Sequence, residues 1–480
     1  MDFKQTGLGK SEIFAAMDEY AVTDMPTQGG RMMAYVYDAG PEVDEVAKAA
    51  YNRFLSCNAL DPTQTPSLTR FENEIVATSI SHLQGDDACV GNFTSGGTES
   101  CMLAVKTARD YMRDKKQLTG KPNLVVPVTA HAAFHKAAHY YDMELRLVEV
   151  DTISFKAIPE KMAAAIDENT VLLVASAVSY AHGVTDPIAE LGQLAMRKDI
   201  CLHVDGCIGA FVLGWMRRMG REITPFDFSV PGVTSISMDW HKYGYCPKGA
   251  SVVLYRNRDI RRHQIFTCSQ WTGYTVINTT IQSTKSGGPV AACWAVMNYL
   301  GEEGYRRLMQ RTLDASDKIL AGIKQIPELT VLGKPEMSLI AFSAQDFNVF
   351  HLVDEMKARD WIIQPQLGFH GSRENVHLSI TQAVLESVDD FLACLKESVE
   401  AAKQLDNAAP PEALVQMLSQ IKPEMLRGPG FNQLMSQFGM AGSDIPERLA
   451  GLNQVLNTMP PELTKAALTE YFNELFVPAA

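Results

Sequence analysis

The chain has 480 residues, of which 46% are hydrophobic and 21% charged, and its formal net charge is −13. These values predict a globular protein of two or three domains with a large core. The acidic balance, without a long run of lysine or arginine, argues against nucleic acid as a partner and against electrostatic recruitment to anionic lipid. Nine scattered cysteines without a CxxC pair favour free thiols in a reducing cytoplasm over a disulfide framework or a metal site. No signal peptide and no apolar run of about 18 residues is found, so we expect a cytoplasmic protein without a transmembrane segment.

Residues 1–60 are expected to form an N-terminal arm. Short helices are predicted over residues 11–20 and 41–54, with a glycine turn at Gly29-Gly30 between them. Apolar positions recur at helical spacing over residues 67–82, which predicts another helix at the start of the main domain.

A glycine pair, Gly96-Gly97, precedes an amphipathic helix that begins near residue 100. Hydroxyl residues flank the pair, as in Thr98. Glycines allow close approach of a ligand to the backbone, and the free N–H groups of a helix start attract anions. The pattern therefore predicts an anion cradle, although an ordinary capped helix start fits it about equally well. It is neither a P-loop, since no lysine follows, nor a dinucleotide-binding GxGxxG motif.

Strands and helices alternate between residues 124 and 205. Strands are predicted over residues 124–128, 145–150, 171–175 and 201–204, and helices over 132–141, 159–167 and 187–198. This alternation predicts an α/β fold with a large, mostly parallel sheet and helices on both faces. Ligands bind at the carboxyl ends of the strands in such sheets. The features that follow predicted strands are His131, the loop 176–183, Asp205 and Lys242.

Three further divisions are expected along the chain. The large domain covers residues 61–300 and closes with a helix over 287–300. A smaller α/β domain covers residues 301–404, with helices at 306–325 and 349–359 and strands near 331, 339–342, 362 and 376–380. Residues 405–480 are expected to form a helical C-terminal extension interrupted by prolines.

Lys242 follows His241 at the end of an apolar strand, before a turn rich in glycine and proline. A lysine in such surroundings suits a Schiff base with pyridoxal phosphate, since burial lowers the amine's pKa and leaves it a neutral nucleophile. Asp205 could pair with the cofactor's pyridinium nitrogen, and His131 could stack on its ring. Read singly, the three residues also fit a solvated turn, a helix cap and a structural histidine.

Several ordered motifs resemble the sphingosine-1-phosphate lyases, a branch of the group II pyridoxal-phosphate-dependent decarboxylases. They are TSGGTES at 94–100, HAAFHKAA at 131–138, HGVTDPI at 182–188, LHVDGCIGAF at 202–211, TSIS-x-D-x-HKYGYCPKGAS at 234–251, GGPVAACWA at 287–295, GKPEMSLIAF at 333–342 and FGMA at 438–441. The resemblance covers nearly the whole chain. It implies a fold-type I homodimer with active sites shared between the subunits.

The resemblance also implies roles for individual residues. Lys242 would carry the imine, Asp205 would pair with the pyridinium and His131 would stack on the ring. The cofactor phosphate would be held by Gly97, Thr98, His241 and Thr284 of the partner subunit, and the residues near the substrate would be Tyr37, Asn58, Asp61, Tyr180 and Lys248. Tyr180 is also a candidate catalytic residue, and no metal is implied. The family reaction is retro-aldol cleavage of a phosphorylated long-chain amino alcohol to an aldehyde and phosphoethanolamine.

The sequence departs from the family where the substrate is expected to bind. Asp61 replaces a histidine, Val276 a tyrosine and Lys285 an arginine, and Ala181 replaces the usual proline. A carboxylate about 4 Å from a substrate phosphate would weaken its binding by more than a hundredfold. An amino-acid decarboxylase on the same scaffold is therefore the alternative activity, favoured if the substrate has a distal cation. A cofactor-binding protein without turnover is the third hypothesis, and the intact lysine, aspartate and histidine argue against it.

Overall fold

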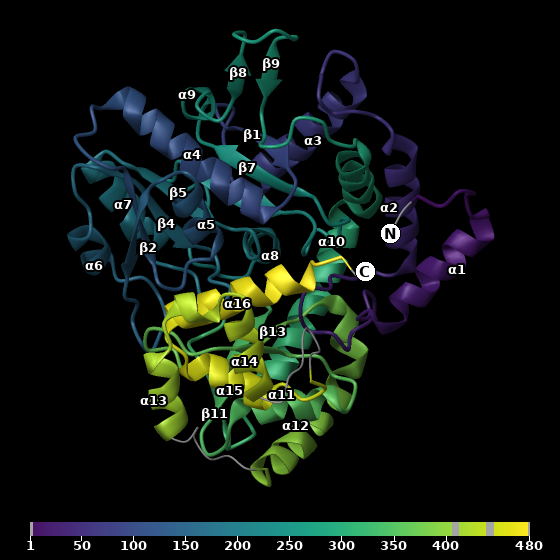
Figure 1. Ribbon diagram of the computed structural model, residues 1–480. Helices are drawn as coiled ribbons and strands as arrows, with labels where there is room; N and C mark the ends of the chain where they lie inside the picture. The colour runs from purple at the N-terminus through teal and green to yellow at the C-terminus, as the bar shows by residue number, and fades with distance from the viewer. Residues whose placement is uncertain (1–2, 406–411, 438–445, 479–480) are drawn as a thin grey trace.

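A computed structural model describes residues 3–405, 412–437 and 446–478. The FGMA motif at 438–441 lies outside these residues. Two main hydrophobic cores form around two separate sheets, and the C-terminal helices build a smaller third core. Figure 1 shows the seven-stranded sheet and its helices in the upper half and the second sheet below.

The large sheet has the strand order β1-β7-β6-β5-β4-β2-β3. Strands β2 to β6 are parallel, whereas β7 runs antiparallel to both β1 and β6. Central strand β4 is buried along its whole length, as expected for a parallel strand covered on both faces. The strands are β1 Val90–Thr94, β2 Asn123–Pro127, β3 Glu144–Val148, β4 Thr170–Ser176, β5 Cys201–Asp205, β6 Ser235–Asp239 and β7 Ser251–Tyr255.

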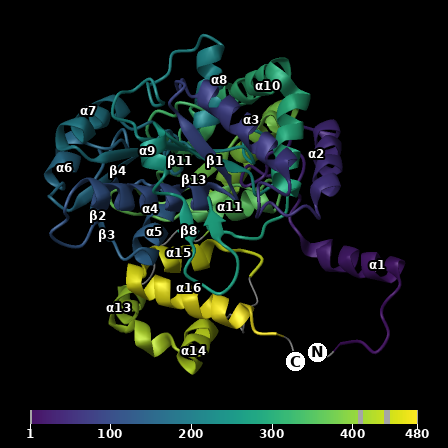
Figure 2. The same ribbon diagram turned by 90° about the horizontal axis from the view of Figure 1, so that it is seen from above.

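Helices cover both faces of this sheet (Figure 2). Helix α4 crosses β4 to β7, while α3 packs on β1 and β7, and α7 on β4 and β5. The helices of this half of the chain are α1 Lys10–Tyr20, α2 Pro41–Phe54, α3 Pro66–His82, α4 Gly97–Lys115, α5 Ala133–Tyr140, α6 Pro159–Ala164, α7 Ile188–Lys198, α8 Ala210–Arg218 and α9 Arg258–Arg261. Helix α1 buries none of its residues.

The second sheet is antiparallel, in the order β10-β11-β13-β12. Its strands are β10 Leu329–Val331, β11 Leu339–Ala344, β12 Gln364–Gln366 and β13 Asn375–Ser379, and its helices are α11 Val349–Lys357 and α12 Val388–Lys403. Helix α10, Gly288–Ile323, enters from the large unit, and it packs Leu308 and Leu313 in the first core and Ile319 and Ile323 in the second.

The C-terminal helices are α13 Glu412–Gln420, α14 Pro429–Gln437, α15 Ala450–Thr458 and α16 Pro461–Leu475. The backbone N–H groups of Leu449 and Ala450 donate to the Asp354 carboxylate, both at 2.9 Å, and so attach α15 to α11. None of the described helices is long and apolar enough to cross a membrane.

The predicted α/β fold with a mostly parallel sheet and a smaller α/β unit is confirmed. Two details differ. The helices predicted over 287–300 and 306–325 are one element, α10, interrupted by non-helical geometry at Gly301. The antiparallel partners β1 and β7 were not predicted, nor was the small hairpin of β8 Phe266–Cys268 and β9 Val276–Asn278. The four-part domain division stays a prediction.

The turn after β6 connects the two cores. The Tyr243 hydroxyl donates to the carbonyl of Ile380 at 2.9 Å and accepts a hydrogen bond from Ser338 Oγ at 2.8 Å. The Tyr305 hydroxyl, on α10, donates to the carbonyl of Gly244 at 3.0 Å. Residues next to Lys242 are thereby tied to the smaller sheet and to α10.

Candidate active site

One cavity of about 230 Å³ lies at the carboxyl ends of β4, β5 and β6. These strand ends are in register, with Ser176 opposite Asp205 and Asp205 opposite Ser237, so the residues that follow them converge. Seven residues predicted from the sequence line this cavity: Gly97, Thr98, His131, Tyr180, Asp205, His241 and Lys242.

Lys242 is ion-paired with Asp239, with 2.9 Å between Nζ and Oδ2. The Asp239 side chain is 1% exposed and also lies 3.5 Å from His241 Nε2. Burial is the largest single influence and lowers the pKa of Lys242, but Asp239, Cys207 and Tyr37 together raise it by more, so the net pKa is above that of an ordinary lysine. The expectation that burial leaves this amine neutral was therefore wrong.

Asp205 ends β5 and is buried. Its Oδ1 accepts a hydrogen bond from the Cys207 N–H at 3.1 Å and lies 3.4 Å from Ser237 Oγ. His203, two residues earlier, has a pKa lowered by burial to about 4 and is hence neutral. No positively charged side chain on β5 therefore lies beside Asp205. Its carboxylate is free to pair with a cation that enters the cavity.

The start of α4 forms one wall of the cavity. A Cβ added to Gly97 would lie 2.8 Å from Asp239 Oδ2 and 2.9 Å from Cys207 Sγ, so only glycine fits here. The preceding loop is fixed by Glu99, whose carboxylate accepts from the N–H of Ser95 at 2.6 Å and of Ile281 at 2.9 Å. The wall therefore presents the first N–H groups of a helix, which suit an anion.

His131 and Tyr180 lie on loops after β2 and β4. The Nδ1 of His131 accepts the N–H of Ala133 at 3.2 Å, which leaves Nε2 as the protonated nitrogen. The Tyr180 hydroxyl donates to Gln364 Oε1 at 2.6 Å, and its ring stacks on His377 with centroids 4.3 Å apart. Burial raises the pKa of Tyr180 well above its ordinary value, so the phenol keeps its proton.

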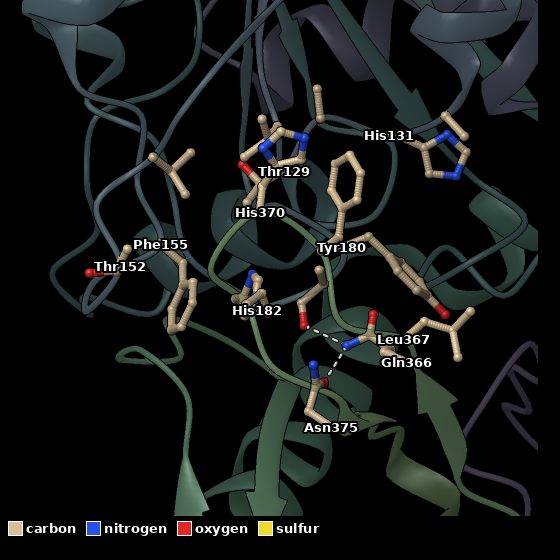
Figure 3. A pocket seen from close by; sticks show the side chains of 17 residues that line it. Thr129, His131, Thr152, Phe155, Tyr180, His182, Gln366, Leu367, His370 and Asn375 are labelled. Carbon is tan, nitrogen blue, oxygen red and sulfur yellow. Dashed lines mark hydrogen bonds between the residues drawn. The ribbon is translucent and has the colours of Figure 1, made fainter. Parts of the chain in front are cut away.

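A second cavity, of about 220 Å³, shares His131 and Tyr180 with the first. Figure 3 shows its side chains, which come from the loops after β2, β3 and β4 and from the β12–β13 segment of the smaller sheet. His182 stacks on Phe155, with centroids 3.9 Å apart, and burial lowers its pKa to about 4. Gln366 ties this segment to the β4 loop by donating to the carbonyl of Ala181 at 3.0 Å.

Tyr37 and Lys248 border a neighbouring cavity of about 380 Å³, which His241 also lines. The Lys248 ammonium lies 4.9 Å from the centroid of the Tyr37 ring and donates to the carbonyl of Tyr35 at 2.9 Å. Burial lowers the pKa of Lys248 and raises that of Tyr37 to about 12. The arm thus brings two predicted substrate residues next to the Lys242 cavity.

Thr284 and Asp61 lie apart from Lys242, in a cavity of about 640 Å³. Asp61 accepts hydrogen bonds from the Thr63 N–H at 2.8 Å and the Thr63 hydroxyl at 2.6 Å, which lower its pKa. Asn58 pairs with Ser286 in an isolated bridge beside it. Within one chain, the structure does not bring these three residues to the Lys242 cavity.

Asp239 is a site residue for which the sequence predicted no role. The available signal was its position three residues before Lys242, at the same strand end, which places a carboxylate within reach of the amine.

The residues of the Lys242 cavity fit pyridoxal phosphate. The donor set comprises a primary amine, a buried carboxylate without a cation beside it, and a helix start that tolerates only glycine. These groups match the cofactor's aldehyde, pyridinium nitrogen and phosphate respectively.

Comparisons with known proteins agree with this fit. Residues 15–345 match the model of the pyridoxal-dependent decarboxylase conserved domain, and residues 412–474 match that of a C-terminal putative HTH domain of pyridoxal-dependent enzymes. The sphingosine-1-phosphate lyase of Arabidopsis thaliana is 41% identical, over 83% of this chain and 73% of its own. Sphingosine-1-phosphate lyase 1 of Mus musculus is 38% identical, over 82% of this chain and 68% of its own.

Solved structures show the same relationship. A sphingosine-1-phosphate lyase of Burkholderia pseudomallei superposes with a TM-score of 0.79 at 31% identity, covering 93% of this chain and 98% of that one. Glutamate decarboxylase of Lactobacillus brevis shares the fold, with a TM-score of 0.74 at 19% identity over 85% of this chain and 96% of its own. The chain therefore belongs to the sphingosine-1-phosphate lyase family of pyridoxal-phosphate-dependent lyases.

Proposed function

We propose that the protein is a carbon–carbon lyase that cleaves a phosphorylated long-chain amino alcohol to an aldehyde and phosphoethanolamine. The observation that carries this proposal is the meeting of Lys242, Asp205 and the Gly97 wall in one cavity, in a chain whose relatives are sphingosine-1-phosphate lyases.

Residues of the Lys242 cavity would hold the cofactor. Lys242 would attach it, Asp205 would bind its ring nitrogen and His131 would cover its ring. Gly97, Thr98 and His241, with Thr284 of the partner subunit, would hold its phosphate. When bound, pyridoxal phosphate withdraws electrons from the substrate carbon next to the amine, which makes the adjoining bond easier to break.

Lys242 and its neighbours differ in whether they hold, lose or accept a proton. Nζ of Lys242 must lose a proton before it can act as a nucleophile, and the ion pair with Asp239 opposes that loss. Burial lowers the pKa of His241, so its imidazole is neutral and can accept a proton. Tyr180 keeps its proton, and its hydroxyl is held in place by the hydrogen bond that it donates to Gln364 Oε1.

The phosphate of the substrate would bind near Lys248 and Tyr37. Lys248 supplies the positive charge, and its ammonium lies 4.9 Å from the centroid of the Tyr37 ring.

A decarboxylase remains a second candidate because Asp61 is held ionised by Thr63 in the cavity that contains Thr284. A carboxylate at that position favours a substrate with a distal cation.

We further propose a cytoplasmic homodimer with shared sites. Its support is that Thr284 and Asp61, which the family resemblance assigns to the site, line a different cavity from Lys242 within one chain, so a second copy would supply them. The nine free cysteines support a reducing compartment. We also propose the divisions 1–60, 61–300, 301–404 and 405–480 as arm, cofactor domain, small domain and extension.

A product assay tests the function. Protein loaded with pyridoxal phosphate receives a phosphorylated sphingoid base and, separately, a panel of amino acids, while aldehyde, phosphoethanolamine and carbon dioxide are measured. Aldehyde and phosphoethanolamine in equal amounts are expected. Carbon dioxide from an amino acid, without aldehyde, would establish the decarboxylase instead. Lys242→Ala is the control, and it should abolish both the turnover and the cofactor absorption band.

A further inference from the structure

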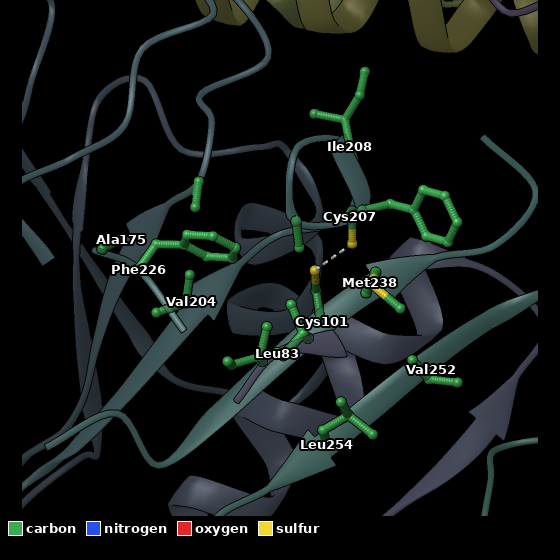
Figure 4. Close-up of a cluster of buried hydrophobic side chains, with 14 of the residues drawn as sticks. Leu83, Cys101, Ala175, Val204, Cys207, Ile208, Phe226, Met238, Val252 and Leu254 are labelled. Atoms are coloured by element: carbon green, nitrogen blue, oxygen red, sulfur yellow. Dashed lines mark hydrogen bonds between the residues drawn. The ribbon is translucent and has the colours of Figure 1, made fainter. Parts of the chain in front are cut away.

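Two thiols, a carboxylate and a hydroxyl meet at the floor of the Lys242 cavity. Cys101 lies near the start of α4, Asp205 ends β5, Cys207 lies in the turn to α8, and Ser237 lies on β6. All four side chains are buried, with exposed fractions of 1%, 7%, 8% and 0%. Figure 4 shows the two cysteine side chains pointing toward each other within the apolar core.

The donor atoms form a compact group. The two Sγ atoms are 3.8 Å apart. Ser237 Oγ lies 3.1 Å from Cys207 Sγ, 3.7 Å from Cys101 Sγ and 3.4 Å from Asp205 Oδ1. The ligand atoms of Cys101, Asp205 and Cys207 all lie within 4.8 Å of one another.

Four of the six separations among these atoms are close to those of a zinc site. Tetrahedral zinc, with sulfur ligands at about 2.3 Å and oxygen ligands at about 2.1 Å, places two sulfurs about 3.8 Å apart, a sulfur and an oxygen about 3.6 Å apart and two oxygens about 3.4 Å apart. The four separations given above agree with these values to within about 0.5 Å. Thiolate with carboxylate is also a donor set that zinc accepts.

An ion can reach this floor through the cavity itself, since Cys101, Asp205 and Cys207 all line it. In the described part of the chain, they are the one group of three His, Cys, Asp or Glu side chains that is close enough to hold a metal ion.

We propose that Cys101, Asp205, Cys207 and Ser237 bind zinc, or a thiophilic divalent ion of similar size, and that this ion and pyridoxal phosphate exclude each other. Each thiol gives up its proton to solvent as its bond to the metal forms, without oxidation or reduction. Exclusion follows because Asp205 serves either the metal or the cofactor's ring nitrogen. This last point rests on the proposed function.

The test starts from the full-length, cofactor-loaded protein, to which zinc chloride is added in steps. Bound zinc and retained cofactor are measured after desalting, with free pyridoxal phosphate plus zinc as a reference. One zinc per chain is expected to bind as the cofactor leaves. Cys101→Ala should raise the zinc concentration for half-release at least tenfold. Cys268→Ala, which removes a partly exposed thiol on β8, should leave it unchanged.

Cobalt provides an independent measurement on wild-type protein stripped of cofactor. A thiolate-to-cobalt charge-transfer band is expected, and Cys101→Ser, which keeps the size of the side chain, should weaken it. Zinc that leaves the cofactor in place would overturn the proposal, as would equal release from Cys101→Ala and Cys268→Ala. The cofactor band before zinc is added, together with the product assay, tests the proposed function separately.

Discussion

Asp239, which is buried at the end of β6, forms an ion pair with the partly buried Lys242 three residues later. Burial alone would lower the pKa of the amine, but the Asp239 carboxylate at 2.9 Å, together with Cys207 and Tyr37, raises it by more, so the pKa of Lys242 is raised. Asp239 is therefore a positioning residue that holds Nζ charged and directed toward the base of the cavity. It sets the pH at which the lysine becomes a nucleophile.

Replacing Asp239 by asparagine should shift that pH downward. Capture of pyridoxal phosphate needs the neutral amine, and without the carboxylate burial lowers the Lys242 pKa, so the neutral form persists to lower pH. We expect the midpoint of the cofactor absorption band, measured against pH, to fall by at least about one unit. Asp110→Asn, which removes a carboxylate from the ion pairs of α4, is the control. An unchanged midpoint would mean that Asp239 does not control this amine.

Asp61→His tests the departure from the family near the expected substrate phosphate. Asp61 is only partly buried and is ionised, so its repulsion of a phosphate is screened by solvent. The effect is thus much smaller than the hundredfold expected for an unscreened pair. We expect KM for a phosphorylated substrate to fall a few-fold at low salt and less at high salt.

Asp61→Asn provides the matched variant, since its amide oxygen can still accept the Thr63 hydrogen bonds. It should reproduce most of the decrease in KM. If neither variant changes KM at low salt, Asp61 does not face the phosphate.

Several site residues could be predicted from the sequence because each carries a local signal. Lys242 and Asp205 follow apolar strands, and Gly97 precedes an amphipathic helix. The charge of Lys242 could not be predicted, because it depends on the distance from Asp239 Oδ2 to Nζ, which only the folded turn fixes.

At the level of elements, α10 links the two cores across a break at Gly301. This residue has φ +54° and ψ −166°, a region that side chains other than glycine rarely enter. Leu300 before the break and Leu308 after it both pack in the first core, so the helix must change direction without leaving it.

Gly301→Ala should lower the free energy of unfolding by about 1–3 kcal/mol, because the new Cβ is strained even though the space around it is open. The urea midpoint measures this change. Gly451→Ala, in α15 and also with open space around it, should cause no loss. Equal midpoints for both variants would show that the break tolerates a side chain.

The parallel strands were predictable because each is a local apolar run between helices. The pairing of β1 with β7 was not, since it joins Val90 to Tyr255 through contacts distant in sequence. The single helix α10 was predicted as two because glycine near residue 301 is an ordinary sign of a helix end.

At the scale of the whole molecule, shared sites predict complementation between two inactive variants. Lys242→Ala and Thr284→Glu each damage every site of their own homodimer. In a mixed dimer one site has both changes and the other has neither, so unfolding and refolding the two together should restore about a quarter of wild-type activity. The separate variants, treated alike, are the controls. If mixed dimers form but show no activity, each chain holds a complete site of its own.

The hydroxyl of Tyr243, next to Lys242, spans from the large unit to the carbonyl of Ile380 in the small one. The turn that carries Lys242 thus connects the two units of the fold as well as forming part of the active site. If the smaller core comes apart, the turn loses this anchor and the bound cofactor loses its fixed surroundings. The visible colour of the holoenzyme should therefore report the melting of a core that the cofactor does not touch.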